Sequence, residues 1–317
     1  MQLNAITGKS AIMAILLLVT IVVAAVVRYS VAPFEMEISN GGSSSGTVSI
    51  IVAVFLFLFC GFIEGKMLLR SGLSNSYCTL PMPIYGVLAC GVFIAPDMVA
   101  TAAASCCFAI ALHLLLRSLH NAEEKDSVFF ASILLGATAL LYPPCVVLVA
   151  VIPIAIFTLA LTLRQSILMF VGYSLPLFAA SYVVWYGGVE YAYFWQEFYE
   201  SLLLAQMTTV AHIPYVAIAL VAFVAVILLG GAVYTMARPN KIFMLTRVRR
   251  SLYLFLFVMF VSLMMVFVPA CDLSAFAIIA VPTTVLLSFV FGVLPNNIST
   301  IGYWILLVVF FIHLFLA

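Results

Sequence analysis

The stretch Trp185–His212, WYGGVEYAYFWQEFYESLLLAQMTTVAH, is the longest interruption between the apolar segments of this chain. It contains two of the chain's three Trp residues. It also contains three Glu residues, and it has no Lys or Arg. Polar side chains recur at three- and four-residue steps from Val189 to Gln206, which predicts an amphipathic helix. We expect one face of this helix to carry Glu190, Tyr193, Glu197 and Glu200, and the other to carry Tyr191, Phe194, Trp195, Phe198, Leu202 and Ala205.

The acidic face distinguishes this predicted helix from helices that lie directly on lipid. Those helices are usually rich in Lys and Arg, because anionic head groups attract positive charge. We therefore expect Val189–Gln206 to dock on the outer surface of the protein itself or on a partner.

The composition is that of a polytopic membrane protein. The 317 residues are 67% hydrophobic and 7% charged, whereas soluble domains are about half apolar and about 25% charged. Eleven segments approach the roughly 20 apolar residues that a spanning helix needs. They are Ala11–Val27, Thr47–Ile63, Leu80–Ala95, Met98–Leu116, Val128–Leu141, Cys145–Leu163, Ile167–Tyr186, Tyr215–Met236, Ser251–Val268, Ser274–Phe291 and Ile301–Leu316. The sequence thus predicts an all-α transmembrane bundle, whose third and fifth spans are short and could be partly re-entrant.

The central stretch also sets the expected domain organisation. We expect a seven-span module over residues 1–186, an amphipathic segment over 187–212 and a four-span module over 213–317. Within the first module Pro96 precedes Arg117 by the same interval as Pro143 precedes Arg164. This recurrence predicts two tandem helical hairpins, because short connections make neighbouring helices antiparallel.

Basic residues are distributed unevenly over the predicted loops. A cytoplasmic N-terminus places eleven of the twelve Lys and Arg on the cytoplasmic side and leaves only Arg28 outside. An excess of Lys and Arg marks cytoplasmic loops. We therefore expect a bacterial inner-membrane protein with a cytoplasmic N-terminus and a periplasmic C-terminus. The same topology places most carboxylates outside, namely Glu35, Glu37, Asp97, Glu190, Glu197, Glu200 and Asp272.

Ionisable residues are missing from the middle of the predicted spans, and Glu64 falls just past the end of Thr47–Ile63. Proton- and ion-coupled transporters keep such groups near the membrane midplane. This argues against a pump or a carrier of charged solutes, and leaves open a carrier or flippase for a neutral or lipidic solute. The chain also has no P-loop, GxSxG, HExxH or GxGxxG in a strand–helix context, and no basic patch suited to nucleic acid.

Candidate chemistry is therefore confined to the outer face. Glu35 and Glu37 are separated by one residue in the first outer loop, and could bind a divalent cation, act as a base, or be solvated carboxylates. Asp97 could join them or cap the following helix. A surface for a substrate or a partner, or else an interfacial aromatic belt, is predicted from Tyr142, Trp185, Glu190, Tyr193, Trp195, Glu197 and Glu200. No Cys/His spacing suits a metal, although Cys145 and Cys271 could form a disulfide.

Residues 131–188 carry a resemblance to a known architecture: ASILLGATALLYPPCVVLVAVIPIAIFTLALTLRQSILMFVGYSLPLFAASYVVWYGG. A small-residue span, a proline turn, a second span, Arg164 and a span containing Pro176 follow one another. The layout of residues 10–205 resembles the GT-C fold of membrane glycosyltransferases that use polyprenyl-phosphate sugars. The same stretch is similar to a family of bacterial polytopic inner-membrane proteins of about this length.

The resemblance implies that the protein binds or acts on a polyprenyl-phosphate-linked sugar at the periplasmic face. It implies a base or divalent-metal ligand at Glu35 or Glu37, and a second acidic residue at Asp97. The alternative is a non-catalytic accessory subunit of a membrane complex, which docks a partner through the acidic helix. Whether the chain is an enzyme stays open at this point.

Overall fold

The computed structural model describes residues 10–31, 43–70, 80–91, 98–120, 127–203, 222–230 and 246–316. Every regular element in these ranges is helical, which agrees with the expected all-α class. The predicted catalytic residues Glu35, Glu37 and Asp97 lie outside the described residues.

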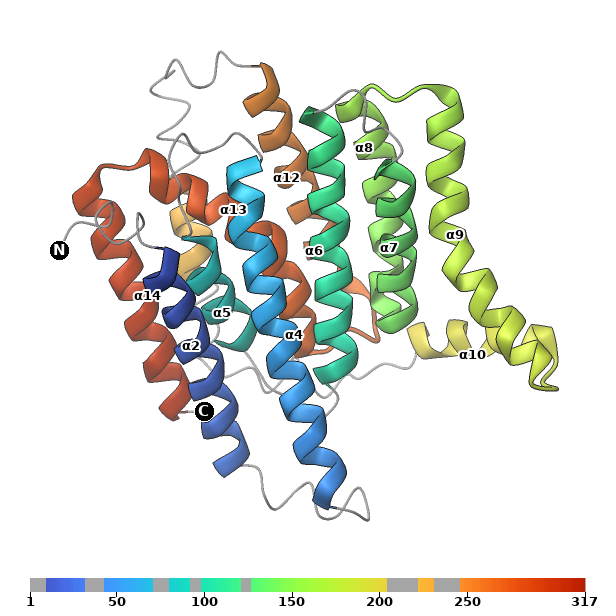
Figure 1. Cartoon of the computed structure of the whole chain (residues 1–317), viewed down its shortest axis with the longest axis horizontal. Coiled ribbons are helices and arrows are strands. Elements are labelled where there is room, and N and C mark those ends of the chain that lie inside the picture. Colours follow the sequence, from blue (N-terminus) through green and yellow to red (C-terminus); the bar gives the residue numbers. More distant parts are fainter. Residues whose placement is uncertain are drawn as a thin grey trace.

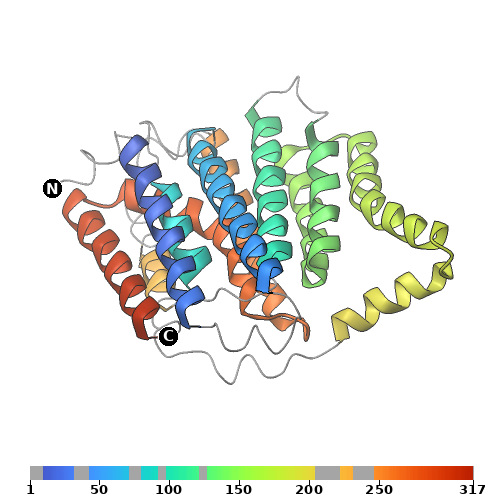
Figure 2. The same cartoon turned by 60° about the horizontal axis from the view of Figure 1, so that its bottom comes forward.

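The helices run side by side in one bundle, and α10 lies across one end of it (Figures 1 and 2). The first half contains α2 (Ser10–Val31), α4 (Ser43–Arg70), α5 (Pro81–Gly91), α6 (Met98–His120), α7 (Ser127–Leu141), η2 (Pro143–Ala150), α8 (Val151–Leu159) and α9 (Leu163–Tyr186). The second half contains α10 (Tyr191–Leu203), α12 (Thr246–Met264), η5 (Met265–Phe267), η6 (Leu273–Ala275), α13 (Phe276–Val293) and α14 (Asn296–Leu316), with a further helical turn over residues 222–230.

Several of these helices are long and apolar enough to cross a membrane. Within the described residues there are five: Val48–Met67, Val99–Leu119, Leu163–Tyr186, Arg249–Phe267 and Phe276–Val293. Four shorter apolar helices accompany them, at Ala14–Ala24, Ser127–Leu141, Pro143–Leu159 and Asn297–Ile312. The chain is therefore a multi-pass helical protein of the membrane class, and the total of eleven spans stays a prediction.

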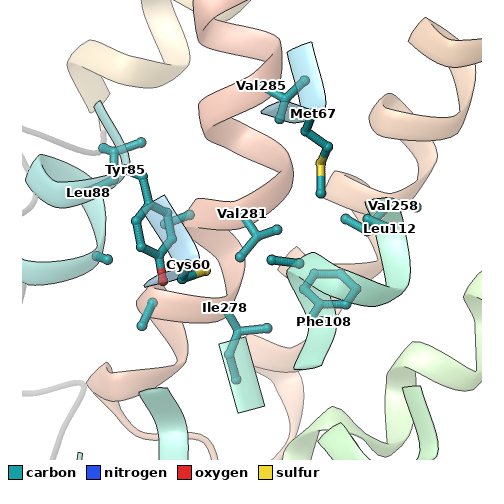
Figure 3. Packing of buried hydrophobic residues seen from close by; sticks show 14 of the residues in the cluster. Cys60, Met67, Tyr85, Leu88, Phe108, Leu112, Val258, Ile278, Val281 and Val285 are labelled. Carbon is teal, nitrogen blue, oxygen red and sulfur yellow. The ribbon is translucent and has the colours of Figure 1, made fainter. Parts of the chain in front are cut away.

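Helix α13 forms the centre of the bundle. All of its residues from 277 to 291 are buried, and it contacts α4, α5, α6 and α12. Its hydroxyls are satisfied internally, since Thr283, Thr284 and Ser288 each donate to the carbonyl four residues earlier, so their burial leaves no donor unpaired. Figure 3 shows Ile278, Val281 and Val285 among side chains of its neighbours, namely Cys60, Met67, Tyr85, Leu88, Phe108 and Leu112.

Helix α4 continues past the predicted end of its span. The sequence predicted a span over Thr47–Ile63, but the apolar stretch extends to Met67 and the helix to Arg70. Glu64 therefore lies in the last turn of this apolar stretch, near the span end where it was expected, and is completely buried. Lys66 is exposed, and the long stem of Lys lets a charged group reach water from within a span.

The predicted span Cys145–Leu163 consists of two helices. Pro143–Ala150 is a 3₁₀-helix, and the α-helical part covers only Val151–Leu159. Pro153 has no N–H, and its ring would clash with the carbonyl four residues earlier, which disfavours a regular α-helix in the turn before it. A 3₁₀ stretch of this length is uncommon.

Helices α7 and α9 approach each other through two glycines. A Cβ at Gly136 would meet the carbonyl oxygen of Tyr173, and a Cβ at Gly172 would meet Oγ of Ser132. The contact is therefore backbone against backbone at Gly136 and backbone against side chain at Gly172, and small residues of this kind let membrane helices approach closely. This contact holds α9 against the bundle.

Most charged residues of the described ranges separate between the two ends of the bundle, and Arg28 of α2 and Glu64 of α4 are the exceptions. The helix directions in Figure 1 place Lys66, Arg117, Arg164, Arg249 and Arg250 at one end. They place Glu190, Glu197, Glu200 and Asp272 at the other, which we call the α10 end.

Candidate functional site at the α10 end

A two-glycine turn sets the direction of α10. Gly188 has φ of +89°, a conformation that glycine adopts without steric cost. The N–H of Gly187 donates to Val183 O and that of Gly188 to Trp185 O, each at 3.0 Å, which closes the end of α9. The chain then reverses, and Figure 2 shows α10 running back toward the bundle below α9.

The apolar face of α10 packs on the protein itself. Trp195 and Phe198 are partly buried against the core, and the Trp195 ring meets Phe178 of α9 edge-on at a centroid distance of 5.6 Å. Helix α10 contacts α9 and η2. Phe194 and Leu202 are also partly buried, as predicted, whereas Tyr191 is 43% exposed and departs from the predicted face. Ala205 lies outside the described residues.

The acidic face of α10 is open. Glu190, Glu197 and Glu200 are all exposed, and Tyr193 and Tyr199 are 54% and 61% exposed. Gln196 Nε2 donates to Glu200 Oε1 at 2.9 Å. The helix itself carries no Lys or Arg. The surface formed by Glu190, Tyr193, Glu197, Tyr199 and Glu200 is called the acidic face below.

Tyr142 lies elsewhere, in a polar cluster inside the same end of the bundle. Its hydroxyl donates to Asp272 Oδ1 at 2.6 Å and accepts the Asp272 N–H at 3.2 Å. Ser274 Oγ donates to the same Oδ1 at 2.5 Å and lies 3.1 Å from Thr101 Oγ1. Burial, reinforced by the neighbouring Cys271 and Asp272, raises the pKa of Tyr142 far above its ordinary value.

This cluster ties three parts of the fold together. Tyr142 precedes η2, Thr101 lies in α6, and Asp272 and Ser274 lie in the connection between α12 and α13. Tyr142 is only 8% exposed, so its hydroxyl bonds to Asp272 in the interior and is unavailable to an external ligand. Sequence reasoning missed Ser274 and Thr101, because no local pattern brings residues so distant in sequence together.

Two cysteines lie beside this cluster. Cys145 and Cys271 are both free thiols, although a disulfide between them was one option. Cys271 Sγ donates to Asp272 O at 3.7 Å. Burial raises the pKa of the Cys271 thiol to about 11, while a hydrogen bond with Tyr142 acts in the opposite direction. Cys271 is therefore a poor nucleophile near neutral pH.

The described residues divide the predicted site into two parts. Tyr193, Trp195, Glu197 and Glu200 share α10, Glu190 lies directly before this helix, and Trp185 is exposed at the end of α9. Tyr142 belongs to the buried cluster. The described ranges contain no group of three or more His, Cys, Asp or Glu residues that could hold a metal ion. The part of the site open to solvent is thus composed mainly of carboxylates and aromatic side chains.

Comparison with family models, with curated proteins and with solved structures gave no match to this chain.

Proposed function

We propose that this protein is a non-catalytic subunit of a membrane complex, and that the acidic face of α10 binds a basic segment of a partner. The proposal places the N-terminus in the cytoplasm of a bacterium and the α10 end on the periplasmic side of the inner membrane. The separation of Lys and Arg from the carboxylates between the two ends of the bundle supports this orientation.

The observation that carries the proposal is the division of α10 into two faces with different surroundings. Trp195 and Phe198 anchor the helix on α9 and η2, so α10 does not need lipid to cover its apolar side. Glu190, Glu197 and Glu200 remain exposed. Anionic head groups repel such a face, whereas a Lys- or Arg-rich segment complements it.

The exposed tyrosines point to the same kind of ligand. Tyr193 and Tyr199 lie beside the glutamates on α10. Tyrosine is enriched at the energetically important positions of protein interfaces, and its ring face attracts Lys and Arg side chains. Carboxylates and tyrosines on one helix therefore suit a basic protein segment.

Affinity purification of the full chain in mild detergent tests this proposal. We expect a stoichiometric partner that is lost when Glu190, Glu197 and Glu200 are all replaced by Lys, and retained when exposed Arg164 at the opposite end is replaced by Gln. A wild-type chain that purifies alone and monodisperse contradicts the proposal. So does a partner that survives the triple charge reversal.

A second candidate function is that of a GT-C-like enzyme acting on a polyprenyl-phosphate-linked sugar. The observation that favours it is the position of α10 across the end of the bundle, directly after a long membrane helix (Figure 1). In this reading Glu35 and Glu37 supply a base or a divalent-metal site. Glu35→Gln and Glu37→Gln should abolish sugar transfer, and transfer at the wild-type rate rules the enzyme out.

A further inference from the structure

Glu64 is an acidic residue buried within a membrane span. It is completely inaccessible to solvent, and neither of its carboxyl oxygens has a hydrogen-bond partner among the described residues. Buried polar groups in folded proteins are almost always paired. An ionisable residue inside a membrane span without a pair is costly, and such residues mark functional sites.

The position of Glu64 on α4 directs it into the bundle. Cys60 lies four residues before it and Met67 three residues after it, so all three share one face of the helix. Cys60 Sγ donates to Ser105 O of α6, and Figure 3 shows Met67 pointing toward Leu112 and Val258. Glu64 therefore projects between α4 and the interior helices rather than toward lipid.

Neighbouring side chains pack closely on α4 beside Glu64. Gly61 and Gly65 flank it, and a Cβ on either would clash with Leu17 or Met82. The titratable residues on the helices packed against α4 are Tyr85 and Cys90 of α5, Cys106, Cys107, His113, Arg117 and His120 of α6, and Arg28 and Tyr29 near the opposite end of α2; Cys60, Lys66 and Arg70 lie on α4 itself, and α13 has none.

An ionised carboxylate in these surroundings would be an unpaired charge in a medium of low dielectric constant. The free-energy cost of that charge is so high that buried carboxyl groups bind a proton instead. A neutral carboxylic acid still offers one O–H donor and a free acceptor oxygen. Glu64 lies six residues before Arg70, the last residue of α4, or about 9 Å along the helix axis. A proton therefore has a short path to the end of the bundle opposite α10.

We propose that Glu64 is a proton-binding site inside the membrane, a carboxylic acid that exchanges its proton with the solution at the end of the bundle opposite α10. The ligand is the proton itself. The site is separate from the acidic face, so the two proposals stand or fall independently. The sequence alone argued against proton coupling. A proton-binding Glu64 would allow proton-coupled movement of the helices around α13.

Labelling of the full chain in lipid vesicles with dicyclohexylcarbodiimide tests this site. This lipid-soluble reagent adds to the protonated carboxyl group and rearranges to a stable N-acylurea, which increases the mass of the peptide by one reagent molecule. At neutral pH we expect an adduct on Glu64 and none on Glu197 or Glu200, because those two side chains are exposed to water, where a lipid-soluble reagent is scarce. We expect the labelling rate to fall as the pH is raised, as the exchangeable proton is lost.

Two variants complete the experiment. Glu64→Gln should lose the adduct and keep the unfolding temperature of the wild type, because a neutral amide of the same size replaces a neutral acid. Glu64→Asp should keep the adduct. Absence of labelling on the wild type, or a labelling rate independent of pH, overturns the proposal. A Glu64→Gln variant with a clearly lower unfolding temperature also overturns it, because that loss indicates an ionised Glu64 paired with a cation.

Discussion

The hydroxyl of Tyr142 donates a 2.6 Å hydrogen bond to the carboxylate of Asp272, although 130 positions separate the two residues in the sequence. This bond joins the turn before η2 to the connection between α12 and α13. It therefore links a helix pair from the first half of the chain to the helix at the centre of the bundle.

Removing this hydroxyl should weaken the whole fold. Tyr142→Phe deletes a hydrogen bond to a carboxylate and leaves the buried part of Asp272 less well satisfied. We expect a loss of about 1.5–3 kcal/mol, measured as a lower midpoint of unfolding in detergent. Tyr186→Phe is the matched control, because Tyr186 is almost fully exposed. Equal stabilities of the two variants would contradict the role given to Tyr142.

The thiol of Cys271 should react slowly with alkylating reagents. Its pKa of about 11 lies about two units above that of an ordinary thiol, so at pH 8 the thiolate is roughly 100-fold rarer than in the unfolded chain. We expect iodoacetamide labelling of the folded protein, followed by mass spectrometry of the Cys271 peptide, to accelerate steadily as the pH rises toward 11. A plateau below about pH 9 in the folded protein would show that burial does not control this thiol.

The α7–α9 contact should not accept a methyl group at either glycine. Gly136→Ala drives the new carbon into the backbone of Tyr173, and Gly172→Ala drives it into Ser132. Overpacking of this kind costs about 1–3 kcal/mol, and the cost should be larger at Gly136 because a backbone carbonyl cannot rotate away. Thermal unfolding of both variants measures the effect.

Gly292→Ala is the control for these two substitutions. Gly292 lies in α13, and nothing stands within 4 Å of the position of its new carbon. Alanine there should leave the protein as stable as the wild type or more stable by about 0.5–1 kcal/mol. Similar losses of thermal stability in all three variants would mean that the α7–α9 contact is not the cause.

Fusions to alkaline phosphatase test the orientation of the bundle. The enzyme is active only after export, so fusions after Asn40 and after Gln206 should be active and a fusion after Asn240 should be inactive. The opposite pattern would place the α10 end in the cytoplasm. Activity at all three sites would show that the predicted span Tyr215–Met236, between Gln206 and Asn240, does not cross.

Local patterns predicted the helices better than they predicted the contacts. The helix expected over Val189–Gln206 was found as Tyr191–Leu203, with Trp195 and Phe198 on the packed side, because amphipathic spacing and burial obey the same geometry. The Gly188 turn starts that helix later than the periodicity indicated. The 3₁₀ stretch before Pro153 was missed, because hydrophobicity alone does not record a missing backbone N–H.

The candidate site was predicted less completely than the fold. Tyr142 was expected at a binding surface, yet its partner Asp272 lies in another half of the chain, and no spacing in the sequence encodes such a pair. Glu64 was expected at a span end, and it lies in the last turn of the apolar stretch Val48–Met67. Its complete burial was not predicted, because the spacing of apolar residues on α4 does not show which face packs against the interior helices.

Site-specific photo-cross-linking from α10 tests the central claim most directly. A benzoylphenylalanine at Tyr193, on the acidic face, should give a protein-sized adduct in intact cells, and that adduct should disappear when Glu197 and Glu200 are replaced by Lys. The same probe at Phe170, an exposed position within the α9 span, should give no such adduct. An adduct at Tyr193 that is insensitive to charge reversal, or cross-links to lipid alone, would contradict a partner-binding role for α10.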